Sequence, residues 1–393
     1  MGKYNFDEVI DRHGTDCLKY DFAKRRGKPA DVLPLWVADM DFKTSSYVED
    51  ALIERAKHGI FGYSDTQEVY FNAVAGWMER HHHWKIKEDW LIKTPGVVFA
   101  LAMAVKAFTK AGDSILIQQP VYYPFSEVIR DNDRVIVSND LILGDDTRYH
   151  IDLADFEKQI VEHDVKLFLL CNPHNPAGRV WTPEELRRIG EICLRNDVFV
   201  VADEIHCELI MPGFRHTPFA SLSDEFARRS VTCTSPSKAF NLAGLQVANI
   251  FAADAAIRER IGQALALNET GEISPFAIEA LTAAYDEGAE WLDALNAYLH
   301  ENYLFLRDFL ARELPQYPVL PLEGTYLAWI DCRAAGMTSE ALAERLLADG
   351  RLFVNPGSIY GAAGEGFIRL NIACPRTLLA DGLERLKKAL TLR

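Results

Sequence analysis

The sequence predicts an α/β protein with a mostly parallel central sheet covered by helices, together with a smaller α+β domain. Residues 167–171, 198–202 and 230–233 form near-continuous apolar runs, which are typical of strands covered on both faces. Between about residues 51 and 290 such runs alternate with helical patterns, and this alternation favours parallel strands. Residues 182–185 (TPEE) predict a helix start, because a capping hydroxyl and a proline precede two acids near the positive end of the helix dipole.

The length of 393 residues exceeds what one hydrophobic core usually supports, so we expect two domains. Residues 51–289 should form a large domain that contains the three apolar runs. Residues 1–50 and 290–393 should form a small domain. Residues up to about 50 are polar and irregular, and they have the character of an arm that crosses the molecule.

The small domain is predicted from four segments that follow a long linking helix at residues 291–313. The apolar segments at residues 326–330 and 367–372 are typical of strands. Helices at residues 339–348 and 378–392 would cover the sheet that these strands form.

The composition excludes several classes of protein. A net charge of −15 argues against a nucleic-acid-binding surface, which requires clustered lysine and arginine. Seven scattered cysteines without a CxxC pair indicate reduced thiols. The N-terminus has no apolar stretch of signal-peptide length, and no run approaches the roughly 20 apolar residues of a membrane span. We therefore expect a cytoplasmic protein that binds neither nucleic acid nor membrane.

Three predicted strands lead to chemically unusual side chains. Asn175, Asp203 and Lys238 each follow one of the three apolar runs. Ligands of open α/β sheets bind outside the carboxyl ends of the strands, so these side chains should face one crevice. Taken singly, the asparagine is typical of a turn, the aspartate of a helix cap and the lysine of the surface. Their joint placement favours a functional site.

Lys238 is the most informative of these residues. Partial burial lowers the pKa of an amine, which makes the amine available as a nucleophile and as a base. Schiff-base chemistry with an aldehyde cofactor needs that property.

Four segments together resemble the fold-type I pyridoxal-5′-phosphate (PLP) enzymes, the aspartate aminotransferase superfamily. Within it the best match is the MalY/PatB group of cystathionine β-lyases, which are C–S lyases. The segments are residues 35–42 (LWVADMDF), 172–181 (NPHNPAGRVW), 203–206 (DEIH) and 235–246 (SPSKAFNLAGLQ). The resemblance covers the chain from about Tyr4 to the last predicted helix, and it implies the PLP-dependent transferase fold type I.

By this resemblance the cofactor is PLP, and Lys238 should bind it covalently. Asp203 should lie at the pyridine nitrogen, where an anion keeps that nitrogen protonated so that the ring can take up electrons. Asn175 and His206 should lie near the phenolic oxygen of the ring. His206 departs from the tyrosine that is common at this position in aminotransferases.

The phosphate of PLP needs hydrogen-bond donors and the positive end of a dipole. Gly96, Val97 and Val98 form a turn that opens a predicted helix, whose backbone N–H groups would make an anion site. An ordinary helix start has the same pattern. Ser235 should add a hydroxyl. Gln246 stands where many aminotransferases carry an arginine, and this difference fits the lyase group better.

Two tyrosines complete the implied cofactor site. Tyr122 should stack on the pyridine face, with Tyr123 as the competing choice. Tyr63 matches the tyrosine that reaches the PLP of the neighbouring subunit. The resemblance therefore implies shared active sites and an obligatory homodimer.

Arg369 lies inside the apolar segment at residues 367–372, where its charge is costly unless it is paired. A structural salt bridge is one interpretation. The resemblance implies instead a bidentate clamp for the α-carboxylate of the substrate, a geometry that the planar guanidinium suits. Ala38 would help to bind the substrate through its backbone.

The triplet His81-His82-His83 invites a metal interpretation, but consecutive residues on a helix do not share a face. No cysteine or carboxylate spacing supports a metal site. We therefore expect a solvated helix end and no metal.

These observations predict a PLP-dependent carbon–sulfur β-lyase of amino-acid metabolism. It would cleave L-cystathionine or related cysteine S-conjugates by α,β-elimination to pyruvate, ammonia and a thiol. The alternative is a class I/II aminotransferase, which would use the same site residues. A third hypothesis is a PLP-binding regulatory protein without turnover, although regulators of this fold usually carry a basic DNA-binding module before it. Contact with a transcription factor is known as a side role of some members of the group.

Overall fold

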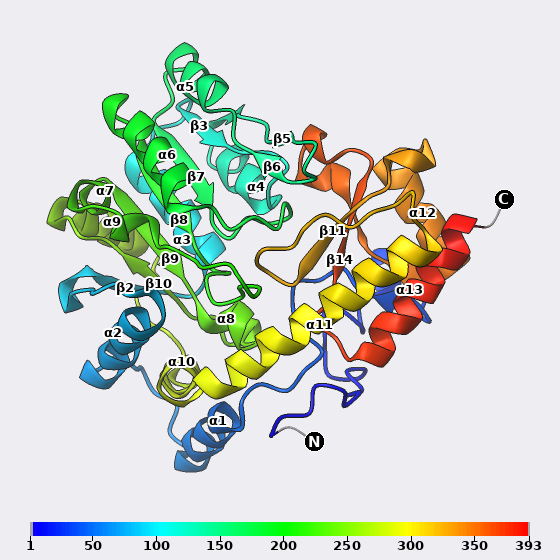
Figure 1. Ribbon diagram of the computed structural model, residues 1–393. Coiled ribbons are helices and arrows are strands. Elements are labelled where there is room, and N and C mark those ends of the chain that lie inside the picture. The colour runs from blue at the N-terminus through cyan, green and yellow to red at the C-terminus, as the bar shows by residue number, and fades with distance from the viewer. Residues whose placement is uncertain (1–2, 392–393) are drawn as a thin grey trace.

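The computed structural model describes residues 3–391, and it contains two main sheets connected by one long helix (Figure 1). The larger sheet has seven strands in the order β2-β10-β9-β8-β7-β3-β4. Strand β10 is antiparallel to both of its neighbours, whereas the five strands from β9 to β4 are parallel. The predicted α/β class with a mostly parallel sheet is therefore confirmed. The strands are β2 (Leu91–Thr94), β3 (Ser114–Ile117), β4 (Val135–Ser138), β7 (Leu167–Cys171), β8 (Phe199–Asp203), β9 (Ser230–Thr234) and β10 (Ala248–Phe251).

Helices cover both faces of this sheet, which explains the continuous apolar runs. Leu167 and Leu169 of β7 pack toward α3 (Val97–Phe108) and α9 (Ala255–Leu267), while Phe168 and Leu170 pack toward the opposite layer. That opposite layer is formed by α5 (Leu153–Glu162) and α6 (Pro183–Arg195). Because successive side chains of a strand point to opposite faces, a strand that is covered on both faces is apolar throughout.

The predicted start of α6 is also confirmed. The hydroxyl of Thr182 accepts a hydrogen bond from the backbone N–H of Glu185 at 3.2 Å. The carboxylate of Glu185 accepts one from the backbone N–H of Thr182 at 2.8 Å. This reciprocal pair is a capping box, which satisfies two donors of the first turn.

The smaller sheet has three antiparallel strands, β11 (Leu327–Asp331), β14 (Phe367–Asn371) and β13 (Asn355–Pro356). Two helices, α12 (Ser339–Gly350) and α13 (Arg376–Thr391), accompany it. Helix α11 (Ala289–Glu313) runs from the larger sheet to this region, as the sequence predicts (Figure 1).

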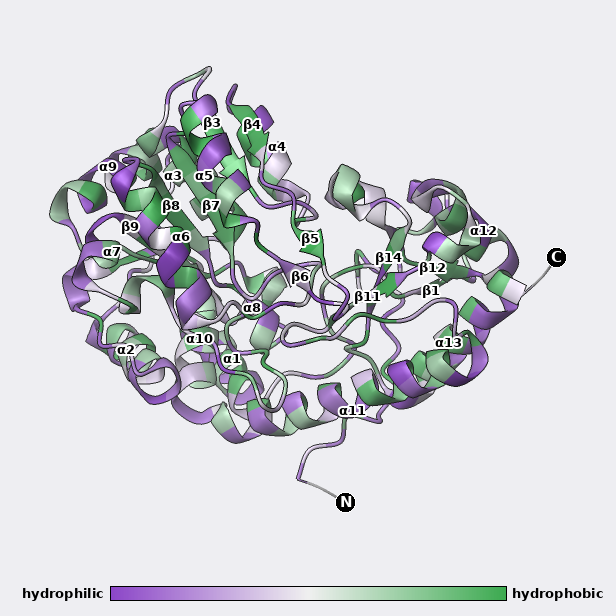
Figure 2. Ribbon diagram, turned by 45° about the horizontal axis from the view of Figure 1, so that its top comes forward, coloured by the Kyte–Doolittle hydropathy of each residue, from purple (hydrophilic) through white to green (hydrophobic). Residues whose placement is uncertain are grey.

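Residues 3–45 form the arm, which reaches the smaller sheet before the chain enters α1 (Ser46–His58). Its strand β1 (Leu33–Pro34) pairs in parallel with β12 (Leu352–Phe353). Buried arm residues share one hydrophobic cluster with residues of α11 and α13. In Figure 2 the strands β3, β7 and β8 are mostly green, whereas α11 and α13 carry both green and purple residues. Since the cluster also includes residues from helices of the large half, the division at residues 50 and 290 stays a prediction.

The remaining α-helices and β-strands lie between these elements in the chain. They are α2 (Glu68–His82), α4 (Pro124–Arg130), α7 (Asp224–Arg228), α8 (Pro236–Ala239), α10 (Pro275–Glu287), β5 (Ile142–Leu143) and β6 (Tyr149–His150). No helix within residues 3–391 is both long enough and apolar enough to cross a membrane.

Candidate active site

The carboxyl ends of β7, β8 and β9 lie side by side. Cys171 is in register with Asp203, and Asp203 is in register with Cys233. Because the three strands are parallel, the segments that follow them emerge at one edge of the sheet. A cavity of about 180 Å³ lies at this edge. It is lined by Ala38, Pro95, Gly96, Val97, Val98, Phe99, Tyr122, Cys171, Asn175, Asp203, Ile205, His206, Ser237, Lys238, Ala243, Gln246 and Val247.

Lys238 lies in α8, one turn beyond the end of β9, and is partly buried. Its Nζ donates a hydrogen bond of 2.7 Å to the carbonyl oxygen of Ala38. Burial and the positive charge of Arg369 lower the pKa of the amine to about 8, while Asp39 and Asp203 oppose the shift. An amine with this pKa is unprotonated in roughly a tenth of the molecules at pH 7, a far larger share than for an ordinary lysine, and a nucleophile or base must be unprotonated.

Asp203 is buried at the end of β8, where its Oδ1 accepts a hydrogen bond of 3.1 Å from the backbone N–H of Ile205. Burial raises the pKa of this carboxyl to about 7. A buried carboxylate with few partners is a costly group, so it is suited to bind a cationic atom of a ligand.

His206 is buried on the same loop, and its Nδ1 has no hydrogen-bond partner within the described chain. Burial, Lys238 and Arg369 hold its pKa well below the usual range, so the imidazole is neutral. Its ring meets that of Tyr326 edge to face, at 6.1 Å between ring centres. A neutral imidazole can donate or accept one hydrogen bond toward a bound group.

The N-terminus of α3 opens into the same cavity. Gly96 is the N-cap residue, and no side chain caps the helix. The first turn contains no acidic residue, and a Cβ added at Gly96 would meet no atom within 4 Å. Free backbone N–H groups at the positive end of a helix dipole form a site for an anion such as a phosphate.

Arg369 reaches the site from β14, with only 2% of its surface exposed. Its guanidinium donates to Oδ1 of Asn175 at 3.1 Å and to the carbonyl oxygen of Trp36 at 2.8 Å. It lies 5.1 Å from the ring centre of Tyr360, and its Nε has no partner in the described part of the chain. No carboxylate among residues 3–391 forms an ion pair with it, so the structural salt bridge is wrong as an interpretation. The charge is available for a bound carboxylate.

Most of the predicted site residues therefore converge on the cavity, but three do not line it, namely Arg369, Ser235 and Tyr63. Arg369 lies next to the cavity and contacts its lining residue Asn175, as described above. Ser235 donates through its hydroxyl to the carbonyl oxygen of Val247 at 2.6 Å and accepts from the backbone N–H of Ser237 at 3.0 Å. The cavity is lined by Ser237 instead. Tyr63 is 96% exposed and lies outside the cavity.

Of the two competing tyrosines, Tyr122 lines the cavity and Tyr123 does not. Burial holds the pKa of Tyr122 well above its usual range, so the phenol is neutral. Its backbone N–H donates to the carbonyl oxygen of Asn175 at 2.9 Å, which ties the two loops together.

Sequence reasoning missed two residues that act on this site, one through Ala38 and one on Lys238. The hydroxyl of Tyr326 donates to the carbonyl oxygen of Ala38 at 2.9 Å. Asp39 opposes the downward pKa shift of Lys238. The two acids in the motif at residues 35–42 were a signal, since buried acids in an otherwise apolar segment require cationic partners.

The histidine triplet corrects another expectation. His82 is buried, and its Nε2 lies 3.0 Å from Oε1 of Glu208, so the end of α2 is not simply solvated. Glu208 raises the pKa of this histidine against the effect of burial. With Cys207 the pair places three metal-type donor atoms within 4.8 Å of one another. Oε1 of Glu208 also accepts from Nε1 of Trp77 at 2.6 Å, and burial keeps the thiol protonated by raising its pKa, so these groups form a hydrogen-bonded network.

The comparisons with known proteins agree with this geometry. Residues 30–386 match the family model of class I and II aminotransferases. The chain is 45% identical over 387 residues to cystathionine β-lyase PatB of Bacillus subtilis, covering 98% of this chain and all of the relative. The chain belongs to the class I and II aminotransferase family, which confirms the predicted family.

Two solved structures are similar over nearly the whole chain. Cystalysin from Treponema denticola, whose structure contains a PLP cofactor, has a TM-score of 0.95 and 38% identity, with 98% of both chains covered. The PLP-bound C–S lyase from Staphylococcus hominis has a TM-score of 0.92 and 34% identity, with 98% of this chain and 99% of that chain covered. The predicted PLP-dependent transferase fold type I is confirmed.

Proposed function

We propose that this protein is a PLP-dependent carbon–sulfur β-lyase that cleaves L-cystathionine or a related cysteine S-conjugate to pyruvate, ammonia and a thiol. The class of enzyme and the cofactor are confirmed by the relatives, which include two cystathionine β-lyases and a PLP-bound C–S lyase. The observation that carries the reaction type is the 45% identity to a cystathionine β-lyase over the full length of both chains. The preferred thioether and the residue roles below are proposals.

The residues that line the cavity fit the chemical groups of PLP. The open N-terminus of α3 would bind the phosphate, Asp203 would hold a proton at the pyridine nitrogen, and Lys238 would bind the aldehyde carbon. Tyr122 would pack on the ring face, and Asn175 and His206 would hydrogen-bond the phenolic oxygen. When bound, PLP supplies an electron-withdrawing ring that takes up the electron pair released at the substrate α-carbon.

The chain's own groups then account for binding, orientation and proton transfer. Arg369 binds the α-carboxylate, and this contact fixes which bond at the α-carbon faces the base. Once the substrate amino group has displaced it from the aldehyde carbon, the Lys238 amine would remove the α-proton, for which its pKa of about 8 is suited. The bond between the β-carbon and sulfur breaks, and the sulfur leaves with the electron pair as a thiolate. Hydrolysis of the remaining three-carbon fragment gives pyruvate and ammonia.

We propose that the enzyme is a homodimer in which Tyr63 serves the site of the partner subunit. The exposure of an apolar segment around this tyrosine supports the proposal, since Ile60 is 68% exposed and Phe61 is 55% exposed. Monomeric proteins rarely leave such contiguous side chains uncovered. The seven free, buried cysteines support a cytoplasmic location.

An aminotransferase remains the second candidate, because the family name covers it and the same residues would serve both reactions. The test is to incubate the purified protein with cystathionine in the absence of any keto acid and to assay pyruvate and thiol. A lyase should release both over many turnovers. An aminotransferase would stop after one half-reaction and would resume only when a keto acid is added. Strict dependence on a keto acid would overturn the proposal.

A further inference from the structure

The arm segment at residues 36–42 runs through the active site without helix or strand, and its carbonyl groups are held by distant side chains. The amide of Asn371 donates to the carbonyl oxygens of Val37 and Asp39, at 2.5 and 2.6 Å. Two residues along the same strand, Arg369 holds the carbonyl of Trp36. Main-chain carbonyls that are buried without regular structure need such partners. The position of this segment is therefore set by its surroundings.

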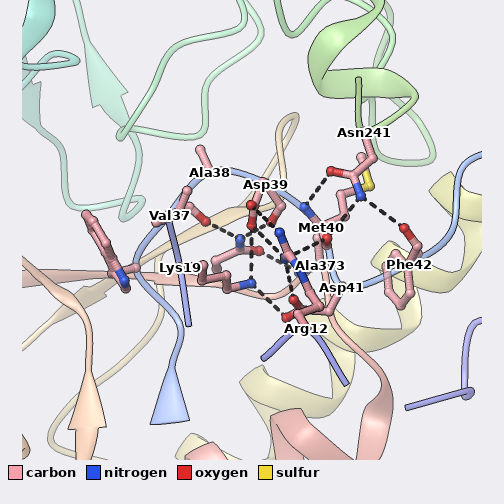
Figure 3. Close-up of polar contacts among 12 residues, drawn as sticks. Arg12, Lys19, Val37, Ala38, Asp39, Met40, Asp41, Phe42, Asn241 and Ala373 are labelled. Carbon is pink, nitrogen blue, oxygen red and sulfur yellow. Dashed lines mark hydrogen bonds and ion pairs between the residues drawn. The ribbon is translucent and has the colours of Figure 1, made fainter. Parts of the chain in front are cut away.

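Lys238 and its loop hold the other part of the segment. The Lys238 amine donates to Ala38, as described above, and the Asn241 amide donates to the carbonyls of Met40 and Phe42 at 3.0 Å each. The Asn241 carbonyl oxygen accepts from the backbone N–H of Met40 at 3.0 Å. Figure 3 shows these hydrogen bonds of Asn241 to Met40 and Phe42.

Four charged side chains form ion pairs between this segment and an earlier part of the arm, and we call them the arm cluster. They are Arg12, Lys19, Asp39 and Asp41 (Figure 3). Lys19 has no exposed side-chain surface, and its Nζ lies 2.7 Å from Asp41 and 3.5 Å from Asp39. Arg12 makes an ion pair of 2.7 Å with each of the two acids and also donates to the carbonyl of Met40 at 3.1 Å. The cluster is balanced, with two positive and two negative charges.

A balanced cluster with two buried members, Lys19 and Asp41, requires explanation, because replacing buried ion pairs by apolar residues often stabilises a protein. Its acids belong to the segment that carries the Ala38 carbonyl, and its bases come from the first 19 residues of the arm. Charge pairs fix the direction of a segment more sharply than apolar contacts, since each hydrogen bond has a preferred geometry.

We propose that the arm cluster is a set of positioning residues for Lys238. It holds the segment so that the Ala38 carbonyl accepts from the lysine amine, and it places the Asp39 carboxylate where its charge acts on that amine. This role rests on the proposed attachment of the cofactor at Lys238.

The charges around Lys238 come from three other parts of the fold. Arg369 on β14 disfavours the protonated amine, while Asp203 on β8 and Asp39 in the arm favour it. The neighbouring titratable groups are neutral ones, namely His206, Tyr122, Cys171 and Tyr326, whose pKa values are shifted by burial toward the uncharged form. Of the two acids that favour the protonated amine, only Asp39 forms ion pairs with Arg12 and Lys19 of the arm cluster.

Two substitutions in the PLP-loaded enzyme test the proposal, because they should shift one pH midpoint in opposite directions. Asp39→Asn removes a negative charge and Lys19→Met removes a positive one, and both break the same ion pair. The readout is the pH midpoint at which the visible absorption band of the Lys238-bound cofactor changes. Asp39→Asn should lower the midpoint by on the order of half a pH unit, because the protonated nitrogen loses a favourable charge. Lys19→Met should raise it.

The double variant Lys19→Met/Asp39→Asn restores the charge balance and should return the midpoint close to that of the unmodified enzyme. Since Lys19 is fully buried, Arg12→Gln provides a second variant that removes a positive charge at a partly exposed position, and it should also raise the midpoint. Shifts of the two single variants in the same direction would reflect damage to the structure and would overturn the proposal, as would the absence of a shift. If borohydride fails to fix PLP at Lys238 in the unmodified enzyme, the proposed function fails instead.

Discussion

The Nζ of Lys238 lies 2.7 Å from the carbonyl oxygen of Ala38, a residue 200 positions earlier in the chain. Two residues before Ala38, the carbonyl of Trp36 accepts from Arg369 at 2.8 Å. One short arm segment therefore contacts both the proposed cofactor lysine and the proposed carboxylate clamp. Because it touches both, the segment links the position of Lys238 to that of Arg369.

Replacing Lys238 by alanine should abolish covalent attachment of PLP. The unmodified enzyme should be yellow, and borohydride should fix the cofactor at Lys238. Lys238→Ala should bind PLP weakly and lose at least about a thousand-fold in turnover, since a general base alone contributes on the order of 10²–10⁴-fold. The measurements are absorption spectra and mass spectrometry of reduced peptides. Lys158→Ala, at an exposed site on α5, is the control, and near-normal activity of Lys238→Ala would refute the assignment.

Asp203 should make the cofactor-free protein less stable above neutral pH. Its pKa in the folded state, about 7, is higher than the ordinary value of 3.8. A carboxyl whose pKa rises on folding stabilises the fold fully below the unfolded pKa, and that contribution is lost as the pH rises through about 7. Asp203→Asn should therefore stabilise the cofactor-free protein above pH 7. The free energy of unfolding should increase by at most about 4 kcal/mol, and the melting temperature should rise with it.

The same substitution should leave the cofactor-free protein unchanged below about pH 4, where both forms of residue 203 are neutral. Calorimetry over a pH series measures the difference. Asp197→Asn, at an exposed turn where Asp197 pairs with Arg229, is the matched control and should show no such pH dependence. A stabilisation by Asp203→Asn that is equal at low and high pH would contradict the assigned cause.

Substitution of Arg369 by lysine should raise KM for the amino-acid substrate. Lysine keeps the charge but cannot form the two parallel hydrogen bonds of a guanidinium. Loss of one hydrogen bond to a charged group costs about 1.5–3 kcal/mol, or about 10–150-fold in affinity. Steady-state kinetics should show this increase, whereas the amount of PLP bound should not change. An unchanged KM would remove Arg369 from the substrate site.

Inactive subunits should complement each other if Tyr63 serves the partner's site. Tyr63 is 96% exposed within its own subunit, while Lys238 lies in the cavity. A heterodimer of Tyr63→Ala and Lys238→Ala subunits contains one site with both residues intact. Mixing the two variants should therefore restore part of the activity, after subunit exchange has been verified by mass spectrometry of the dimers. No recovery would argue against a composite site.

Some positions of the site could be predicted because local sequence decides them. Asn175, Asp203 and Lys238 follow buried strands, and the parallel order of those strands brings their ends to one edge. The start of α3 could also be predicted, because the turn at Gly96 is a local sequence feature. Errors arose where the partner of a side chain lies far away in the sequence. His82 was expected in solvent, but it is buried and contacts Glu208, which lies 126 residues away in the sequence.

The sequence by itself determined the fold class, the family and the capped start of α6. These features depend on residue order over short stretches, through hydrophobic periodicity, turn chemistry and contiguous motifs. Tertiary structure alone decided which serine faces the cavity, how Arg369 is held and what supports Ala38. The bonds of Arg369 to Trp36 and of Lys238 to Ala38 span 333 and 200 residues. Contacts of this length depend on how three separate parts of the chain pack, and no local pattern records that packing.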